Sequence, residues 1–330
     1  MTVCCGPLLA ALSACLAATS CTGVQSALAP SGYHAGRIAA LFWWMTGVGV
    51  AVWIFVVALA LYYARTANGE QNRRRDGWLI VGGGVAFPTI TLTILLVYGL
   101  AMIPETVARA PEGSLQVAVT GEQWWWRVRY LTAEGEQAVL ANEIRLPVGE
   151  PVQFRLDSDN VIHSFWVPSL GGKMDMIPGR VTWLTLRPEV TGIFRGACAE
   201  YCGTSHGLMS FYVQVMEKAA FDEWLAHQAR PARLPADAEA ARGAGLFLSN
   251  GCSACHTVRG TPAAGVIGPD LTHVGGRLSI GAGIMDTRPG QLRDWLARTG
   301  HIKPGVHMPA FGMLPDADLQ ALAAYLDGLE

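Results

Sequence analysis

Two long stretches without any charge constrain this chain more than any other feature of its sequence. Residues 38–64 read IAALFWWMTGVGVAVWIFVVALALYYA, and residues 77–104 form a second uncharged run. Each run exceeds the ~20 residues that a helix needs to cross the hydrocarbon of a bilayer. Pro88 and the Gly82–Gly84 cluster are tolerated in membrane helices. We therefore expect a transmembrane hairpin over residues 22–110, with helices at about 38–64 and 78–103, rather than two buried core helices.

The charges between the two runs predict the orientation. Arg65 and Arg73–Arg75 lie in the connection, and basic connections stay in the cytoplasm. We expect a bacterial inner-membrane protein, in contact with membrane lipid, whose residues after Pro104 lie on the periplasmic side. Thiols persist there as disulfides or metal ligands. The net charge of −2 gives no reason to expect a nucleic-acid partner.

The first 21 residues have the short apolar run and small residues of a signal segment. The sequence AATSC around Cys21 resembles a lipoprotein cleavage box, but no Lys or Arg precedes Arg37. Lipidation of Cys21 is therefore left open.

Beyond the hairpin, the pattern first predicts strands and then helices. Segments such as PVQFRLDS and VTWLTLRP are rich in β-branched and aromatic residues, between turn residues. We expect an all-β sandwich or Greek-key barrel over residues 111–217. Residues 218–236 read as a short helical stretch broken by Pro231 and Pro235, which is a linker by its composition. Residues 237–330 read as a small all-α domain.

The α domain contains CSACH at Cys252–His256, the C-x-x-C-H pattern of covalent haem c attachment. The thiols of Cys252 and Cys255 would add to the haem vinyl groups, and His256 would ligate the iron. Met308 in HMPAF is the favoured sixth ligand. A redox-active cysteine pair is the alternative, but it lacks a βαβ context. His273, His301 and His307 compete with Met308, whereas Met285 and Met313 are expected to be ordinary core or loop residues.

The β domain contains CAEYCGTSHGLM, which places Cys198, Cys202, His206 and Met209 within twelve positions. Soft sulfur and imidazole ligands suit copper. The two thiolates could bridge two copper ions, with His206 and Met209 as terminal ligands and His163 as a ligand from elsewhere in the chain. A disulfide between the two cysteines is the alternative.

Together, CAEYCGTSHGLM, HSFWVPSLGGKMDMIPGR and the hairpin resemble subunit II of haem–copper cytochrome c oxidases, from about Ser26 to Glu217. The fused CSACH domain resembles the caa-type branch, which carries a class I cytochrome c at the end of that subunit. The resemblance implies a multidomain membrane protein: a two-helix hairpin, a cupredoxin domain and a cytochrome c domain.

The resemblance also implies a dinuclear copper centre, CuA. Cys198 and Cys202 would bridge the coppers, His163 and His206 would bind one each, and Met209 and the Glu200 carbonyl would complete the set. The Glu200 side chain would face a magnesium site shared with subunit I. No ligand position of this pattern is substituted, which argues against the quinol oxidases.

Further roles are implied by the same resemblance. Electrons would enter CuA through the aromatic cluster Trp124, Trp125 and Trp126, although the second position is commonly tyrosine in the family. The Pro269 carbonyl would orient His256, and Arg277 would meet a haem propionate. Lys173, Asp175 and Arg180 match a loop near subunit I.

We therefore expect the electron-input subunit of a terminal oxidase. Electrons would pass from a donor cytochrome c or bc complex to haem c, to CuA and on to haem in subunit I. Oxygen would be reduced there with proton pumping, in a complex with the other oxidase subunits. Two alternatives are a CuA-containing subunit of a nitric oxide reductase and a membrane-anchored copper-binding or assembly factor.

Overall fold

The computed structural model describes residues 22–66, 73–132 and 135–330 and divides the chain into two compact units. One unit spans residues 37–108, and the other contains the remaining described residues. The predicted signal segment, including Cys21, lies outside the described residues.

The smaller unit consists of long apolar helices. Helix α2 (Tyr33–Arg65) comes first, and α3 (Arg73–Trp78), the π-helix η1 (Leu79–Ala86) and α4 (Phe87–Val107) follow it. Two segments, Tyr33–Arg65 and Arg73–Pro104, are long and apolar enough to cross a membrane, and their most apolar windows have no buried residue. A helix of 33 residues is ~50 Å long, more than the hydrocarbon thickness of a bilayer.

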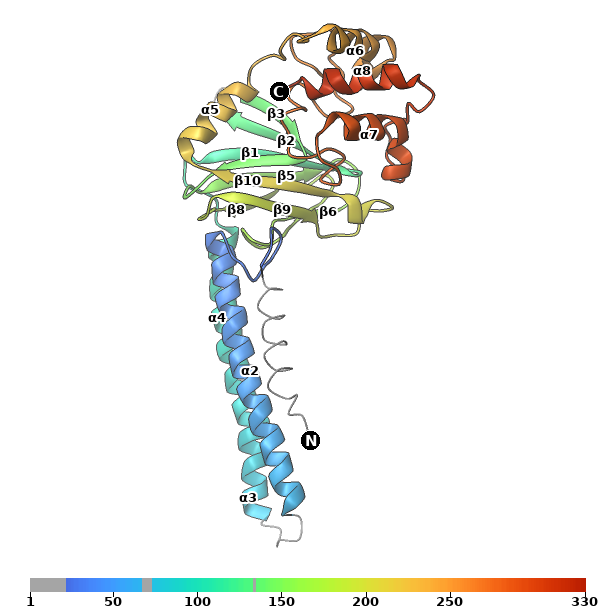
Figure 1. Cartoon of the computed structure of the whole chain (residues 1–330). Coiled ribbons are helices and arrows are strands. Elements are labelled where there is room, and N and C mark those ends of the chain that lie inside the picture. Colours follow the sequence, from blue (N-terminus) through green and yellow to red (C-terminus); the bar gives the residue numbers. More distant parts are fainter. Residues whose placement is uncertain (1–21, 67–72, 133–134) are drawn as a thin grey trace, which may run out of the picture. The chain divides into compact units, whose positions relative to one another are not determined.

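The larger unit begins with a β-sandwich of two five-stranded sheets (Figure 1). The first sheet has the order β3-β2-β1-β5-β8, and the second has the order β4-β10-β9-β6-β7. The strands of the first sheet are β1 (Leu115–Glu122), β2 (Trp125–Thr132), β3 (Gly135–Ala141), β5 (Val152–Ser158) and β8 (Thr182–Leu186). Those of the second are β4 (Glu143–Pro147), β6 (His163–Trp166), β7 (Met174–Met176), β9 (Gly192–Cys198) and β10 (Ser210–Met216).

Most strand pairs are antiparallel, but each sheet also contains one parallel pair, β1 with β5 and β4 with β10. The alternation of the sequence explains the layers. In β2, for example, Trp126, Val128 and Tyr130 are fully buried while the residues between them are partly exposed. Because successive side chains point to opposite faces of a strand, one face of the sheet forms the core.

The segment that we expected to be a linker begins as a helix. Helix α5 (Lys218–Gln228) buries Phe221 and Leu225 in the sandwich core, so these apolar side chains hold it against the sheets. The chain between α5 and the next helix contains Pro231 and Pro235 and has no regular structure.

The last part of the chain is helical, as predicted. It consists of α6 (Ala238–Ser249), the short 3-10 helix η3 (Cys252–Ala254), α7 (Pro289–Ile302) and α8 (Asp316–Asp327). The side chain of Asp237 caps α6 by accepting a hydrogen bond from the Ala240 amide at 2.8 Å. Phe247, Leu292 and Leu322 belong to a separate core. The predicted fold class, an apolar helical hairpin followed by an all-β and an all-α domain, is confirmed.

Candidate metal and haem centres

The first candidate centre lies at the end of the second sheet. The loop from β9 to β10 carries Cys202 and His206, while Cys198 ends β9 and Met209 directly precedes β10. His163 comes from 35 residues earlier, at the start of β6. Strand β6 pairs with β9 so that Phe165 lies opposite Cys198. This register brings His163 close to the loop between β9 and β10, which carries Cys202 and His206 and is called the cysteine loop below.

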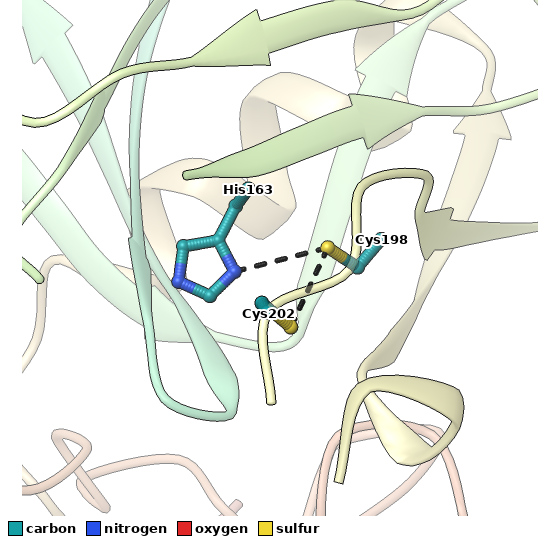
Figure 2. Close-up of side chains that lie close together, drawn as sticks. All are labelled: His163, Cys198 and Cys202. Atoms are coloured by element: carbon teal, nitrogen blue, oxygen red, sulfur yellow. Dashed lines mark hydrogen bonds between the residues drawn. The ribbon is translucent and has the colours of Figure 1, made fainter. Parts of the chain in front are cut away.

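The donor atoms of these residues lie close together, and Figure 2 shows three of them, His163, Cys198 and Cys202. The two cysteine sulfurs are 3.8 Å apart, and Cys198 Sγ lies 3.7 Å from His163 Nδ1. Cys202 Sγ lies 3.6 Å from His206 Nδ1 and 3.8 Å from Met209 Sδ. The ligand atoms of His163, Cys198 and Cys202 all lie within 4.8 Å of one another.

These distances favour a metal site over a disulfide. A disulfide requires sulfurs ~2.05 Å apart, whereas Cys198 and Cys202 are free thiols at 3.8 Å. Nitrogen and sulfur ligands at ~2.0–2.3 Å from a shared metal ion are separated by about 3.5 Å. The Glu200 carbonyl oxygen, 3.1 Å from Cys198 Sγ, adds a sixth donor. The residues present therefore fit soft metal ions such as copper.

Both cysteines are buried, and the contact between them shifts their pKa values in opposite directions. The contact with Cys202 lowers the pKa of Cys198 to about 3, with help from His163 and the Glu200 carbonyl and against the effect of burial. The same contact, together with burial, raises the pKa of Cys202. The pair thus holds one thiolate readily, and thiolate is the form that binds metal.

Close packing behind the site fixes His163. A Cβ atom at Gly121 would lie 2.8 Å from His163 Cδ2, so glycine allows β1 to approach the imidazole. The Trp126 ring packs edge-on against Phe165 and Phe211, and its centroid lies 6.1 Å from that of His163. His163 is therefore held by the sandwich core.

The second candidate centre is a cavity in the helical domain. Cys252, Cys255 and His256 line it from η3 and the following turn, and Met308 lines it from the loop after α7. His256 Nδ1 lies 2.7 Å from the Pro269 carbonyl oxygen. Burial lowers the pKa of His256, which favours the neutral imidazole that can ligate iron. A Cβ atom at Gly268 would lie 2.6 Å from His256 Cε1, so glycine is needed beside this ring.

The competing ligands lie in different surroundings. His307 also lines the cavity, whereas His273 and His301 are absent from its described lining. Both ring nitrogens of His273 lie near carbonyl oxygens, 2.9 Å from Glu330 and 3.1 Å from Arg230. Met285 packs at the helical core, and Met313 is 78% exposed.

Arg277 also lines this cavity, and one N–H donor of its guanidinium group has no hydrogen-bond partner among the described residues. One terminal nitrogen donates to the Asp270 carbonyl, but the buried Nε has no hydrogen-bond partner among the described residues. A buried guanidinium donor that faces a cavity fits an anionic ligand group such as a haem carboxylate.

The three consecutive tryptophans lie in different environments. Trp126 is fully buried in the sandwich core, and Trp125 is partly exposed beneath the Arg127 guanidinium, 4.7 Å from the ring centroid. Trp124 is 7% exposed, and its Nε1 donates to the Cys202 carbonyl at 3.0 Å. Trp124 and Trp125 line the cavity of the helical domain.

Sequence reasoning missed two residues at this position. Gln123 Nε2 donates to the Cys202 carbonyl at 2.8 Å, and Lys303 Nζ donates to the Trp124 carbonyl at 2.7 Å. Neither residue belongs to a recognisable motif, so no local signal could have identified them. Lys173 and Asp175, in the predicted subunit I loop, form an exposed ion pair at 2.7 Å.

Comparisons with known proteins show the family of each domain. Residues 131–216 match the family model of the cytochrome c oxidase subunit II periplasmic domain, and residues 240–330 match that of cytochrome c. These two matches imply copper and haem c as cofactors. Cytochrome c oxidase subunit 2 of Alkalihalophilus pseudofirmus is 33% identical over 285 residues, which cover 84% of this chain and 81% of the relative.

Two further comparisons involve other bacteria. Cytochrome c oxidase subunit 2 of Bacillus sp. strain PS3 is 32% identical over 258 residues, 74% of this chain and 70% of the relative. The crystal structure of the periplasmic domain of cytochrome oxidase subunit II from Bradyrhizobium japonicum matches 36% of this chain and 96% of that domain, with 29% identity and a TM-score of 0.34. The chain belongs to the cytochrome c oxidase subunit 2 family, as a member with a C-terminal cytochrome c domain, and is thus a component of an oxidoreductase complex.

Proposed function

We propose that this chain is the electron-input subunit of a respiratory oxidase. Electrons from a donor cytochrome c or bc complex enter at the helical domain, cross to the cupredoxin domain and leave to haem in subunit I. Oxygen is reduced to water in subunit I, coupled to proton pumping. This chain supplies the route and the ligands.

In this proposal, the sandwich holds a dinuclear copper centre. The thiolates of Cys198 and Cys202 would hold the metals together with His163, His206, Met209 and the Glu200 carbonyl. The convergence of their donor atoms at 3.6–3.8 Å supports this assignment. When bound, the copper pair and the haem supply the one-electron carriers.

In the helical domain, Cys252 and Cys255 attach the haem and His256 ligates its iron. His256 Nδ1 donates a hydrogen bond to the Pro269 carbonyl at 2.7 Å, so Nε2 of the neutral ring carries no proton and the ring orientation is fixed. Met308, which also lines the cavity, would offer its sulfur to the iron. Arg277 Nε binds a haem carboxylate.

The observation that carries the proposed route is the position of Trp124. Its ring lines the haem cavity, while its Nε1 donates to the Cys202 carbonyl. One side chain thus connects the two candidate centres. Trp124 is the residue through which electrons cross in this proposal, with Trp125 at the cavity beside it and Trp126 as a core residue that supports His163.

The membrane hairpin anchors the subunit and presents its two domains on the periplasmic side. The exposed Glu200 carboxylate would contribute to a magnesium site shared with subunit I. Lipidation of Cys21 would add a second anchor.

The test is metal analysis of the full chain, produced with haem c maturation and copper, combined with visible and near-infrared spectra. Two coppers and one covalent haem per chain, with a mixed-valence near-infrared band, are expected. A reduced donor cytochrome should then reduce both centres. One loosely held copper without that band would contradict the proposal and favour a copper-binding or assembly factor.

A further inference from the structure

A buried lysine lies where the helical domain meets the sandwich. Lys303 directly follows α7 and is 2% exposed. Its Nζ donates to the Trp124 carbonyl at 2.7 Å and to the Gly281 carbonyl at 2.8 Å. The same side chain thus connects a backbone group of the sandwich with one of the helical domain, and it lines the haem cavity.

Keeping an ammonium group in this place is unfavourable. No carboxylate of the described chain forms an ion pair with Lys303, and buried unpaired charges are costly. Burial lowers the pKa of Lys303 to about 7, against the attraction of the Cys202 sulfur. The contact with the Trp124 carbonyl compensates part of this cost only while the domains stay together, so the lysine is suited to link them.

Three further contacts show that the helical domain packs closely against the sandwich. Gly305 has a φ of +80°, and a Cβ atom there would lie 2.9 Å from Trp124 Cη2, so this loop packs directly on the indole ring. Ser205, in the cysteine loop, donates to the Pro304 carbonyl at 2.5 Å. The Ser210 amide donates to the Ala282 carbonyl at 3.0 Å.

We propose that Lys303 is a positioning residue, which holds the helical domain against Trp124 so that electrons can cross to the cysteine loop. Its ammonium group holds two segments, residues 281–283 and 303–306, around the tryptophan. The inference rests on the proposed function, because it concerns the route between the same two centres. It gives a residue outside both ligand sets a part in the docking of the two domains.

The test compares Lys303→Met with the wild-type full chain, loaded with haem and copper. Methionine fills similar space but donates no hydrogen bond. Amide hydrogen exchange over residues 205–210 and 276–283 should become about tenfold faster, because two hydrogen bonds from a charged donor are lost. Electron transfer from photoreduced haem to copper should slow about tenfold, since it requires the same docked state. Metal contents and spectra should not change.

Lys218→Met is the matched control, because Lys218 is an exposed lysine of α5 that pairs with Asp222; it should change neither readout. Gly305→Ala disturbs the packing of the helical domain on Trp124 from another position, so it should also accelerate amide exchange. This variant keeps the proposal testable if Lys303→Met loses its haem. Unchanged exchange in Lys303→Met would overturn the proposal, and a shifted redox potential alone would assign the lysine an electrostatic role instead. If the wild type shows no electron transfer between filled centres, the proposed function fails, while the exchange result still tests the docking.

Discussion

The copper site and the haem site differ in how the chain builds them. The proposed copper ligands are brought together by the strand register, since β6 places His163 beside the end of β9. Their donor atoms already lie within 3.8 Å of their neighbours. The haem ligands instead line a cavity whose walls come from several helices and from the sandwich residue Trp124. The first site is held by a rigid core and the second by the packing of separate elements.

The largest expected effect is on the copper site alone. Cys202→Ser replaces a bridging thiolate whose sulfur lies 3.6–3.8 Å from three other donor atoms. We expect complete loss of the copper pair and its near-infrared band, with one haem still bound per chain. Metal analysis and visible spectra of the full chain would check this result. Loss of haem as well would show that the two regions do not form their sites independently.

The corresponding change in the haem site should have a smaller effect, because the two cysteines keep the haem attached. Met308→Leu removes the proposed axial sulfur and should lower the haem potential by on the order of 100 mV, since axial ligands set haem potentials. Met313→Leu is the control, because Met313 is 78% exposed. Potentiometric titration of both variants gives the comparison. Equal potentials would mean that another residue, such as His307, ligates the iron.

Two glycines test the difference in rigidity between the regions. Gly121→Ala places a Cβ atom 2.8 Å from His163, and Gly268→Ala places one 2.6 Å from His256. We expect Gly121→Ala to weaken copper binding about 10- to 100-fold, the usual cost of a displaced ligand support. Gly268→Ala should shift the haem spectrum without loss of haem, because the helical-domain loops can adjust.

The controls for these variants are Gly207→Ala and Gly245→Ala, since a Cβ atom at either position meets nothing within 4 Å. Copper titration and visible spectra are the measurements. An equal loss of cofactor in both test variants would contradict the contrast between a rigid and an adjustable site.

The same contrast explains what the sequence could predict. The haem motif is contiguous, so Cys252, Cys255 and His256 are recognisable without a fold. His163 is 35 residues from Cys198; it was predicted as a ligand from elsewhere in the chain, and the family resemblance implied its place in a dinuclear copper centre. The roles of these residues stay predictions until metal is measured. The fold class followed from uncharged runs and alternation, whereas α5 was expected as part of a linker because Pro231 and Pro235 dominate the composition nearby.

Contacts between the domains had no sequence signal. Lys303 directly follows α7, a position where a lysine is ordinary. Its hydrogen-bond partners are backbone carbonyls of residues that lie 179 and 22 positions away in the sequence. Carbonyl groups carry no residue identity, so a pattern of side chains cannot reveal them. Such contacts become visible only when the packing is known.

The smallest expected effect is a pH dependence at this contact. Burial lowers the pKa of Lys303 to about 7 from 10.5, so the unfolded chain binds more protons at this residue between those values. Stability therefore rises with pH in that window, by at most about 1.4 kcal/mol per pH unit. Below pH 7 both states carry the proton, and the burial cost is fully present.

Lys303→Met removes this contribution, so its melting temperature relative to wild type should be highest near pH 6 and fall toward pH 10. The other titratable groups around Lys303 are present in both proteins: Cys202, whose sulfur attracts the ammonium group, and Glu122, Cys252, Cys255, His256, Arg277 and His307 around the cavity. Thermal unfolding of both full chains, followed by circular dichroism across this range, measures it. A difference independent of pH would mean that Lys303 keeps an ordinary pKa, so that the contact between the domains is more hydrated than the buried ammonium indicates.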